Sequence, residues 1–197
     1  MKTLFSTLIL LCSLVAGCSQ TLKPIPLSAP DMTREATMMQ AFAQRKSTRE
    51  FSPRMLSKQD LSDLLWAANG INRPESGKRT APSAMNRQDI DLYVCLEKGA
   101  YFFDYKQNML VPVTDQDLRT MKDAPVVLLL VARGSGDEPW GAMDAGIVSQ
   151  NISLFCAAAG LATVPRTSMD APALARALGL PEDCTPMLNQ PVGYFRK

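Results

Sequence analysis

Two short strings in this chain combine residue types that can bind a planar, anionic ligand. The first is Arg-Lys-Ser-Thr-Arg at 45–49, in which the guanidinium groups of Arg45 and Arg49 flank the hydroxyl of Ser47. On an extended or turning backbone these three side chains can face one anion, and the arginine fork donates two parallel hydrogen bonds to a phosphate. By its spacing alone, the string also fits an exposed basic turn that follows a helix.

The second string is a polar loop stiffened by proline, Arg-Thr-Ala-Pro-Ser-Ala-Met-Asn at 79–86. A hydroxyl at Ser83 and an amide at Asn86 suit the edge of a flat polar ring. The same residues are also common in loops that bind nothing.

The composition excludes several classes of chemistry. The chain has no histidine, which removes Ser-His-Asp and Cys-His catalysis and imidazole-bound zinc. A net charge of +2 without blocks of like charge gives no indication of a nucleic-acid surface. There is no complete Gly-x-Gly-x-x-Gly, and the paired aspartates are typical of solvated charges. Any redox chemistry is therefore expected to come from a cofactor.

The first residues are typical of an export signal. Met1-Lys2 precede an apolar run over 4–15, and Val-Ala-Gly-Cys at 15–18 matches the bacterial lipoprotein box, with Cys18 as the residue that carries the lipid. An unlipidated secretory signal or a plain membrane anchor are the alternatives. We expect a signal peptide over 1–17, a tether over 18–30 and one folded domain over 31–197. Ser19 favours the outer membrane, so the expected location is the periplasmic side of the cell envelope.

The periodicity of apolar residues predicts an α+β domain with a mainly antiparallel central sheet flanked by helices. No disulfide is assigned to Cys95, Cys156 and Cys184, and Cys156 is expected in the core. A half-buried strand over 90–96, a hairpin into 100–105, a central strand over 125–131 and a final strand over 190–195 are expected. Helices are expected over 31–44, 57–70, 115–121, 141–161 and 171–178, with a long loop over 71–88.

A third region gives the first two strings a common context. Residues 159–168 read Ala-Gly-Leu-Ala-Thr-Val-Pro-Arg-Thr-Ser, and residues 189–194 read Asn-Gln-Pro-Val-Gly-Tyr. With the two strings above, in this order, the chain resembles the FMN-dependent nitroreductase family from about Arg45 to Tyr194, most closely the branch of azoline-type dehydrogenases. The resemblance implies the nitroreductase fold and an intertwined homodimer with FMN at the subunit interface. It places the long helix over 141–161 in that interface.

The resemblance also implies a role for each motif. Arg45, Ser47 and Arg49 meet the phosphate or the pyrimidine edge of FMN. The loop of the other subunit, with Pro82, Ser83, Ala84 and Asn86, lies against the isoalloxazine ring. Pro165, Arg166, Thr167 and Ser168 lie beside flavin N5, which carries the hydride, so no catalytic side chain is required.

Two departures from the family pattern leave the reaction open. Thr167-Ser168 stand where relatives that oxidise nicotinamides often have Glu-Gly, and the chain stops at Arg196-Lys197, which either reach the phosphate or leave one anchor absent. The first expectation is a two-electron, ping-pong FMN oxidoreductase acting on a small molecule with NAD(P)H. Because NAD(P)H is not expected outside the cytoplasm, the alternative is a dehydrogenase or oxidase of a small molecule or peptide, with oxygen or a quinone as acceptor. A flavin-free binding or structural lipoprotein is the second alternative.

Overall fold

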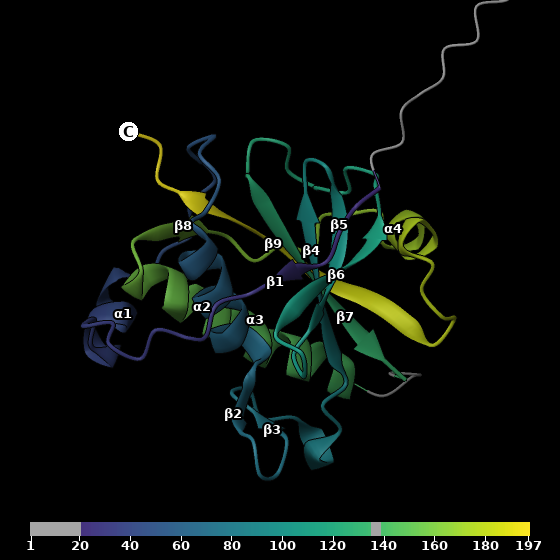
Figure 1. Cartoon of the computed structure of the whole chain (residues 1–197), viewed down its shortest axis with the longest axis horizontal. Coiled ribbons are helices and arrows are strands. Elements are labelled where there is room, and N and C mark those ends of the chain that lie inside the picture. Colours follow the sequence, from purple (N-terminus) through teal and green to yellow (C-terminus); the bar gives the residue numbers. More distant parts are fainter. Residues whose placement is uncertain (1–20, 135–138) are drawn as a thin grey trace, which may run out of the picture.

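The computed structural model describes residues 21–134 and 139–197, and it has the α+β architecture that the sequence predicts (Figure 1). Its helices are α1 (Met38–Gln44), α2 (Lys58–Asn69), α3 (Trp140–Ala158) and α4 (Ala171–Leu178), with one 3₁₀ turn, η1 (Ala84–Asn86). Its strands are β1 (Ile25–Pro26), β2 (Ile71–Arg73), β3 (Lys78–Arg79), β4 (Ile90–Leu96), β5 (Gly99–Asp104), β6 (Met109–Thr114), β7 (Val126–Arg133), β8 (Leu161–Thr163) and β9 (Cys184–Tyr194).

Seven of these strands form one antiparallel sheet in the order β1-β6-β5-β4-β7-β9-β8, and β2 and β3 form a separate hairpin. The central strand β7 is buried from Val126 to Ala132, which explains its continuous apolar sequence. Successive side chains of a strand point to opposite faces, so the alternate residues of β7 belong to two different clusters. Val126, Leu128 and Leu130 pack in one cluster, and Val127, Leu129 and Val131 pack in the other.

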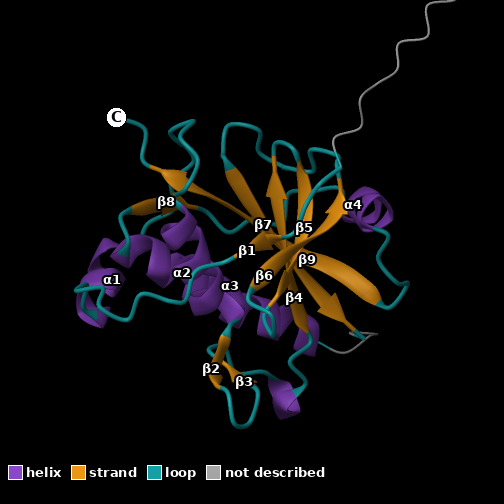
Figure 2. Cartoon of the chain, viewed as in Figure 1, coloured by secondary structure: helices purple, strands orange, loops and turns teal. Residues whose placement is uncertain are grey.

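Helices cover both faces of this sheet (Figure 2). The first cluster includes Leu64 and Leu65 of α2 and Ile152 of α3, so α2 and α3 cover one face, with α1 packed on α3. The second cluster includes Leu174 and Leu178 of α4, which lies across the other face. Burial of both faces of β7 contributes to the hydrophobic stabilisation of the domain.

The boundaries of α2 agree with the prediction because its caps are strong local signals. The Ser57 hydroxyl accepts a hydrogen bond from the backbone N–H of Asp60, and the N–H of Gly70 donates to the Trp66 carbonyl. The first helix is shorter than predicted: α1 begins at Met38, where Thr37 and Gln40 form a capping box. Upstream, the Asp31 carboxylate accepts from the backbone N–H of Thr33 and favours a turn over a helix.

The helix predicted over 115–121 is wrong, since residues 115–125 form turns and bends. The Asp117 carboxylate accepts hydrogen bonds from both the backbone N–H and the guanidinium of Arg119. Such side-chain bonds to nearby backbone groups compete with helical hydrogen bonding. The loop predicted over 71–88 contains the β2–β3 hairpin and η1, and the final strand begins at Cys184, earlier than predicted.

The segment predicted to be a tether contributes β1, which pairs with β6 at the edge of the sheet. Leu22, Ile25 and Leu27 pack against the core, so these residues belong to the folded domain. The predicted signal peptide and Cys18 lie outside the described residues. Within residues 21–134 and 139–197, no helix has both the length and the apolar character needed to cross a bilayer.

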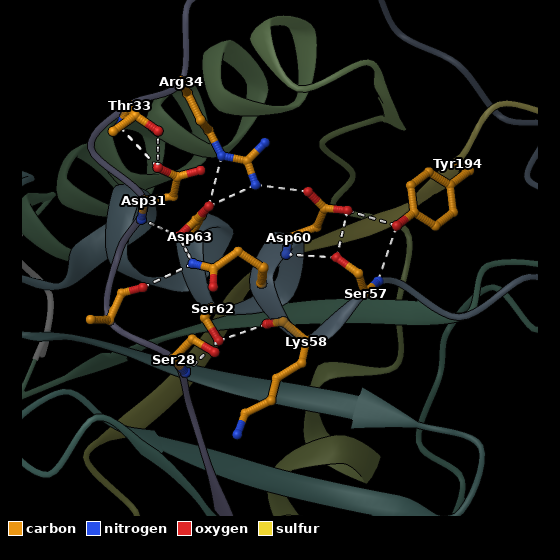
Figure 3. A network of polar contacts seen from close by, with 12 residues as sticks. Ser28, Asp31, Thr33, Arg34, Ser57, Lys58, Asp60, Ser62, Asp63 and Tyr194 are labelled. Carbon is orange, nitrogen blue, oxygen red and sulfur yellow. Dashed lines mark hydrogen bonds and ion pairs between the residues drawn. The ribbon is translucent and has the colours of Figure 1, made fainter.

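A polar network connects the N-terminal segment that contains Arg34, through α2, to Tyr194 at the end of β9 (Figure 3). Arg34 donates to Asp63 at 2.7 Å and to Asp60 at 2.8 Å. Asp60 also accepts from the hydroxyl of Tyr194 at 2.7 Å, and that hydroxyl accepts from the Ser57 N–H at 3.0 Å. Burial raises the pKa of Asp60, but the bonds from Tyr194, Arg34 and Ser57 outweigh it and hold the pKa below its usual value. The last residue of the Pro-Val-Gly-Tyr string is therefore a structural anchor.

Candidate functional site

The Arg-Lys-Ser-Thr-Arg segment follows α1 and runs beside β8. The N–H of Thr48 donates to the Thr163 carbonyl at 2.9 Å, which fixes this segment against the short edge strand. Arg45, Ser47 and Arg49 are exposed, and their side chains have no hydrogen-bond or ion-pair partner within residues 21–134 and 139–197. Two guanidinium groups and a hydroxyl at this edge are thus free to contact an anion.

Residues 165–168 continue directly from β8, so the second predicted segment starts next to the first. Arg166 pairs with Asn189 of β9 through two backbone hydrogen bonds of 2.9 Å. The amide of Asn189 also donates to the carbonyls of Arg166 at 3.1 Å and Ser168 at 3.3 Å. Its oxygen accepts from the Thr120 hydroxyl at 2.7 Å. Asn189 is fully buried and fixes the backbone conformation of residues 166–168.

A cavity of about 390 Å³ lies where α1, α3, β8 and the C-terminal tail meet. Its volume is within the range of small-molecule sites. The lining comes from the N-terminal segment, α3, β8 and the tail: Ala43, Gln44, Lys46, Ser153, Ala157, Gly160, Leu161, Thr163 and Phe195.

The wall that α3 gives to this cavity rests on a buried polar network. The side chain of Gln190, which is fully buried, accepts from the Ser149 hydroxyl at 2.8 Å and donates to the Ser153 hydroxyl at 3.1 Å. Ser153 in turn donates to the Ser149 carbonyl at 2.9 Å. The bonds of Gln190 join β9 to α3, so they set the spacing of the helix and the sheet.

The third predicted segment, Pro82 to Asn86, lies at the other end of α3. The N–H of Ala84 donates to both carboxylate oxygens of Asp144, at 3.1 and 3.0 Å. From Asp144 to the last residue of α3, Ala158, the helix rises about 21 Å before the chain reaches β8. In Figure 1, β2 and β3 lie at the foot of the view, and β8 and the C-terminus lie at its upper left. One protomer therefore does not bring this loop to the first two segments.

The C-terminal residues Arg196 and Lys197 do not extend the cationic group formed by Arg45 and Arg49. Arg196 donates to the Phe51 carbonyl at 3.3 Å and lines a separate cavity of about 300 Å³. Lys197 is exposed at the end of the chain. Lys46, which belongs to the 45–49 string but was given no role in it, lies 5.3 Å from the ring centre of Phe195 and lines the 390 Å³ cavity.

On the α4 side, Ser168 also lines a larger cavity of about 490 Å³. The turns at 116–120 form one wall, and Ala173, Leu174 and Ala177 of α4 form the other. The pKa of Asp117 in this wall is held at about 2, chiefly by the side-chain hydrogen bond from Arg119. Within the described ranges there is no cluster of three or more metal-binding side chains.

Asn189, Gln190 and Thr120 are the site residues that sequence reasoning missed. A signal for two of them was present, because a polar pair directly before Pro-Val-Gly in an apolar strand needs buried partners. Thr120 carried no such signal, since it lies in a segment predicted to be helical.

Comparisons with known proteins agree with this arrangement. The model of the nitroreductase family matches residues 42–194. A protein of Methanocaldococcus jannaschii named as a nitroreductase is 29% identical over 163 residues, which are 70% of this chain and 81% of that protein.

Solved structures give the same result. A Ralstonia eutropha JMP134 protein described as a nitroreductase is 37% identical, has a TM-score of 0.84 and is matched over 92% of both chains. A chain of the Escherichia coli microcin synthetase complex is 16% identical with a TM-score of 0.68, over 98% of this chain and 85% of that chain. The second likeness shows a shared fold alone.

Proposed function

Because this chain belongs to the nitroreductase family of oxidoreductases, we propose that it is an FMN-dependent oxidoreductase that acts on a small molecule. One observation carries the proposal. The exposed side chains of Arg45, Ser47 and Arg49, which have no partner within the described ranges, lie where Thr48 joins β8, the strand that leads into residues 165–168.

The donor set fits FMN. Arg45 and Ser47 would hold the phosphate or the pyrimidine edge, and Arg49 would add positive charge near the reduced ring. The backbone of Pro165–Ser168, held by Asn189, would lie beside N5. FMN would supply two-electron hydride transfer through N5 in ping-pong order. The protein's own part is to orient ring and substrate and to exclude water.

The homodimer is part of this proposal. The loop with Pro82, Ser83, Ala84 and Asn86 is at the far end of α3 from the anion-binding segment, so a second copy has to supply it. The exposed apolar residues of α1 and α3 give such a copy a surface to cover. They are Met38, Met39, Phe42, Met143 and Ile147.

The electron donor follows from location. We propose that Cys18 is lipidated and that the domain lies in the cell envelope, where NAD(P)H is not expected. Thr167 and Ser168 replace the Glu-Gly of nicotinamide-oxidising relatives, which favours a donor of another kind, with a quinone or oxygen as acceptor. NAD(P)H-dependent reduction is the competing version of the same chemistry.

The absorption spectrum of purified residues 19–197, followed by anaerobic NADH or NADPH, tests the proposal. We expect a yellow protein with flavin bands, and loss of FMN affinity by about 30-fold or more when Arg45 is replaced by alanine. Arg54→Ala is a matched control, since Arg54 is also exposed but lies over the Tyr194 ring at 4.4 Å.

Bleaching of the flavin by NADH or NADPH would identify a nicotinamide as the electron donor. A yellow protein that neither compound bleaches would indicate an electron donor other than a nicotinamide. A colourless protein that takes up no added FMN would overturn the proposal and leave a binding or structural lipoprotein on the same fold.

A further inference from the structure

Two buried carboxyl groups lie beneath the Pro82–Asn86 loop. Asp89 directly precedes β4 and is 4% exposed, and Asp144 lies on α3 and is 2% exposed. Both line one small cavity of about 10 Å³, whose roof is formed by Pro82 and Ser83. That volume is about the size of one water molecule or less, so the two groups face each other with little between them.

Their hydrogen bonds are unequal. Asp144 accepts from the Ala84 N–H with both oxygens, at 3.1 and 3.0 Å. Both carboxyl oxygens of Asp89 are buried, and no donor from the described residues reaches them. Asp89 raises the pKa of Asp144, both as a side-chain hydrogen-bonding partner and as a neighbouring charge. Ionised carboxylates only accept hydrogen bonds, so two that face each other in a buried site are satisfied only when a proton lies between them.

The charged groups around the pair do not replace that proton. Arg87, which follows this loop, lowers the pKa of Asp144. Burial and the neighbouring Asp89 raise that pKa by more, so the net shift is upward. Arg79 of β3 donates to the Ile90 carbonyl and lies 3.6 Å from the ring centre of Tyr105. Arg133 of β7 pairs with Asp91 at 2.9 Å. α2 contributes the neutral Asn69, whose amide also donates to the Ile90 carbonyl.

We propose that Asp89 and Asp144 share one proton and that this pair is the pH-sensitive anchor of the Pro82–Asn86 loop. The pair is a positioning device for the loop. Its importance for flavin binding rests on the proposed function, in which that loop serves the partner's site.

The backbone of the loop needs such an anchor. Met85, Asn86 and Gln88 have φ values of 50°, 56° and 50°, in the left-handed region that costs a residue with a side chain free energy. The Ser83 hydroxyl accepts from the Gln88 N–H at 2.8 Å, and Asp144 holds Ala84. If Asp144 were lost as an acceptor or repelled by an ionised Asp89, the strain of these residues would favour release of the loop.

The direction of the pH dependence follows from the same contacts. Burial raises the pKa of Asp144, the bond from Ala84 opposes this shift, and the neighbouring Asp89 adds to it. A group whose pKa is higher in the folded state stabilises that state at low pH and loses the effect as pH rises through the raised value. The loop is therefore held firmly on the acid side and released on the basic side.

Hydrogen exchange of the Ala84 amide, measured by NMR across the pH range on protein without added flavin, tests the proposal. In the native protein we expect its protection factor to fall by up to about tenfold per pH unit once the pair loses its proton. Asp89→Asn replaces the shared proton with an amide donor, so protection should become independent of pH. Asp123→Asn, an exposed aspartate with the same charge change, should behave like the native protein.

An infrared measurement gives a second readout that does not depend on the loop. As the pH rises above the ordinary aspartate pKa, the native protein and Asp123→Asn should keep the band of a protonated carboxylic acid that Asp89→Asn lacks. Absence of that band in the native protein, or equal pH profiles for the native protein and Asp89→Asn, would overturn the proposal. Restored protection at high pH on addition of Ca²⁺ or Na⁺ would also overturn it and identify a cation site.

Because no flavin is present in either measurement, failure here leaves the proposed function untouched. Failure of flavin binding would likewise leave these results standing.

Discussion

Asn189 shows how one buried amide can determine the shape of a whole segment. Its backbone pairs with Arg166, its amide group donates to the carbonyls of Arg166 and Ser168, and its oxygen accepts from Thr120. No other described side chain makes as many bonds to residues 165–168. The motif singled out Pro165–Ser168, but the residue that holds their backbone comes from β9.

Replacing Asn189 by leucine should therefore destabilise the protein more than its size change implies. The variant leaves the Ser168 carbonyl and the Thr120 hydroxyl without their partner and removes one of the two hydrogen bonds to the Arg166 carbonyl, at a cost of about 1–3 kcal/mol in the free energy of unfolding. Urea unfolding measures it. Thr120→Val, which removes one bond to Asn189, should cost about 0.5–1.5 kcal/mol. Equal stability of Asn189→Leu and the native protein would contradict the role given to this side chain.

The three cysteines among the described residues differ in environment. All three are free thiols. Burial raises the pKa of Cys95 to about 12, and burial also raises the pKa of Cys156, which lies fully inside the core. Cys184 is half-buried at the start of β9.

In the folded protein a maleimide should consequently modify Cys184 alone, because the thiolate is the reactive species and only this sulfur is accessible. Intact mass spectrometry of residues 19–197 should show one adduct in buffer and three in denaturant. Modification of Cys95 or Cys156 without denaturant would mean that the sheet or α3 opens locally.

At the scale of the element, the sequence predicted those helices and strands whose signals are local. α2 has Ser57 and Gly70 as caps, and β7 is a continuous apolar run between polar ends. The elements that were missed are β6, η1 and four short strands, β1, β2, β3 and β8. These four strands have two or three residues each, too few for a period to be seen. β1 pairs with β6 and β8 pairs with β9, both distant in sequence, so tertiary contacts decide these two strands, whereas β2 and β3 pair with each other.

The Asp117–Arg119 pair, which favours a turn over the helix predicted at 115–121, should also make a measurable contribution to stability. Hydrogen bonding by Arg119 lowers the pKa of Asp117 to about 2, so the pair stabilises the fold at pH values above the ordinary aspartate value. That contribution is lost as pH falls from about 4 to 2. Asp117→Asn should cost about 0.5–1 kcal/mol at neutral pH, because the pair is partly exposed, and the cost should vanish in acid.

Urea unfolding at several pH values measures that difference between the native protein and Asp117→Asn. Asp115 lies two residues away in the same turn region, which makes Asp115→Asn unsuitable as a control. Asp123→Asn is the better control, because Asp123 is exposed and makes no hydrogen bond or ion pair with Arg119. A gap between native protein and Asp117→Asn that widens in acid would contradict the assignment.

At the scale of the whole molecule, the length of α3 determines which of the three predicted site segments lie together. The motifs at 45–49, 82–86 and 165–168 were found from their residues, but a sequence does not say which of them one protomer unites. The structure brings the first and third together through β8 and holds the second at Asp144, about 21 Å away along the helix. This separation supports the proposal that a partner supplies the loop, which the resemblance to the family implied.

The outer face of α3 gives the matching prediction. Met143 is 56% exposed and Ile147 is 36% exposed, beside the apolar α1 that packs on the same helix. If a second copy covers this face, Ile147→Glu buries a charge without a partner, and the dimer should dissociate about 30-fold or more readily. Val113→Glu is a close control, because Val113 is 38% exposed and lies on β6.

Sedimentation equilibrium of the native protein and both variants measures the association directly. We expect a native dimer, a dimer for Val113→Glu and a folded monomer for Ile147→Glu. Since the loop at Pro82–Asn86 would then reach no partner site, the monomer should also bind FMN more weakly, which links the apolar face to the cofactor. A native monomer that binds FMN tightly would refute both the dimer and the role of the partner's loop in FMN binding, because a single chain keeps this loop at the far end of α3 from Arg45.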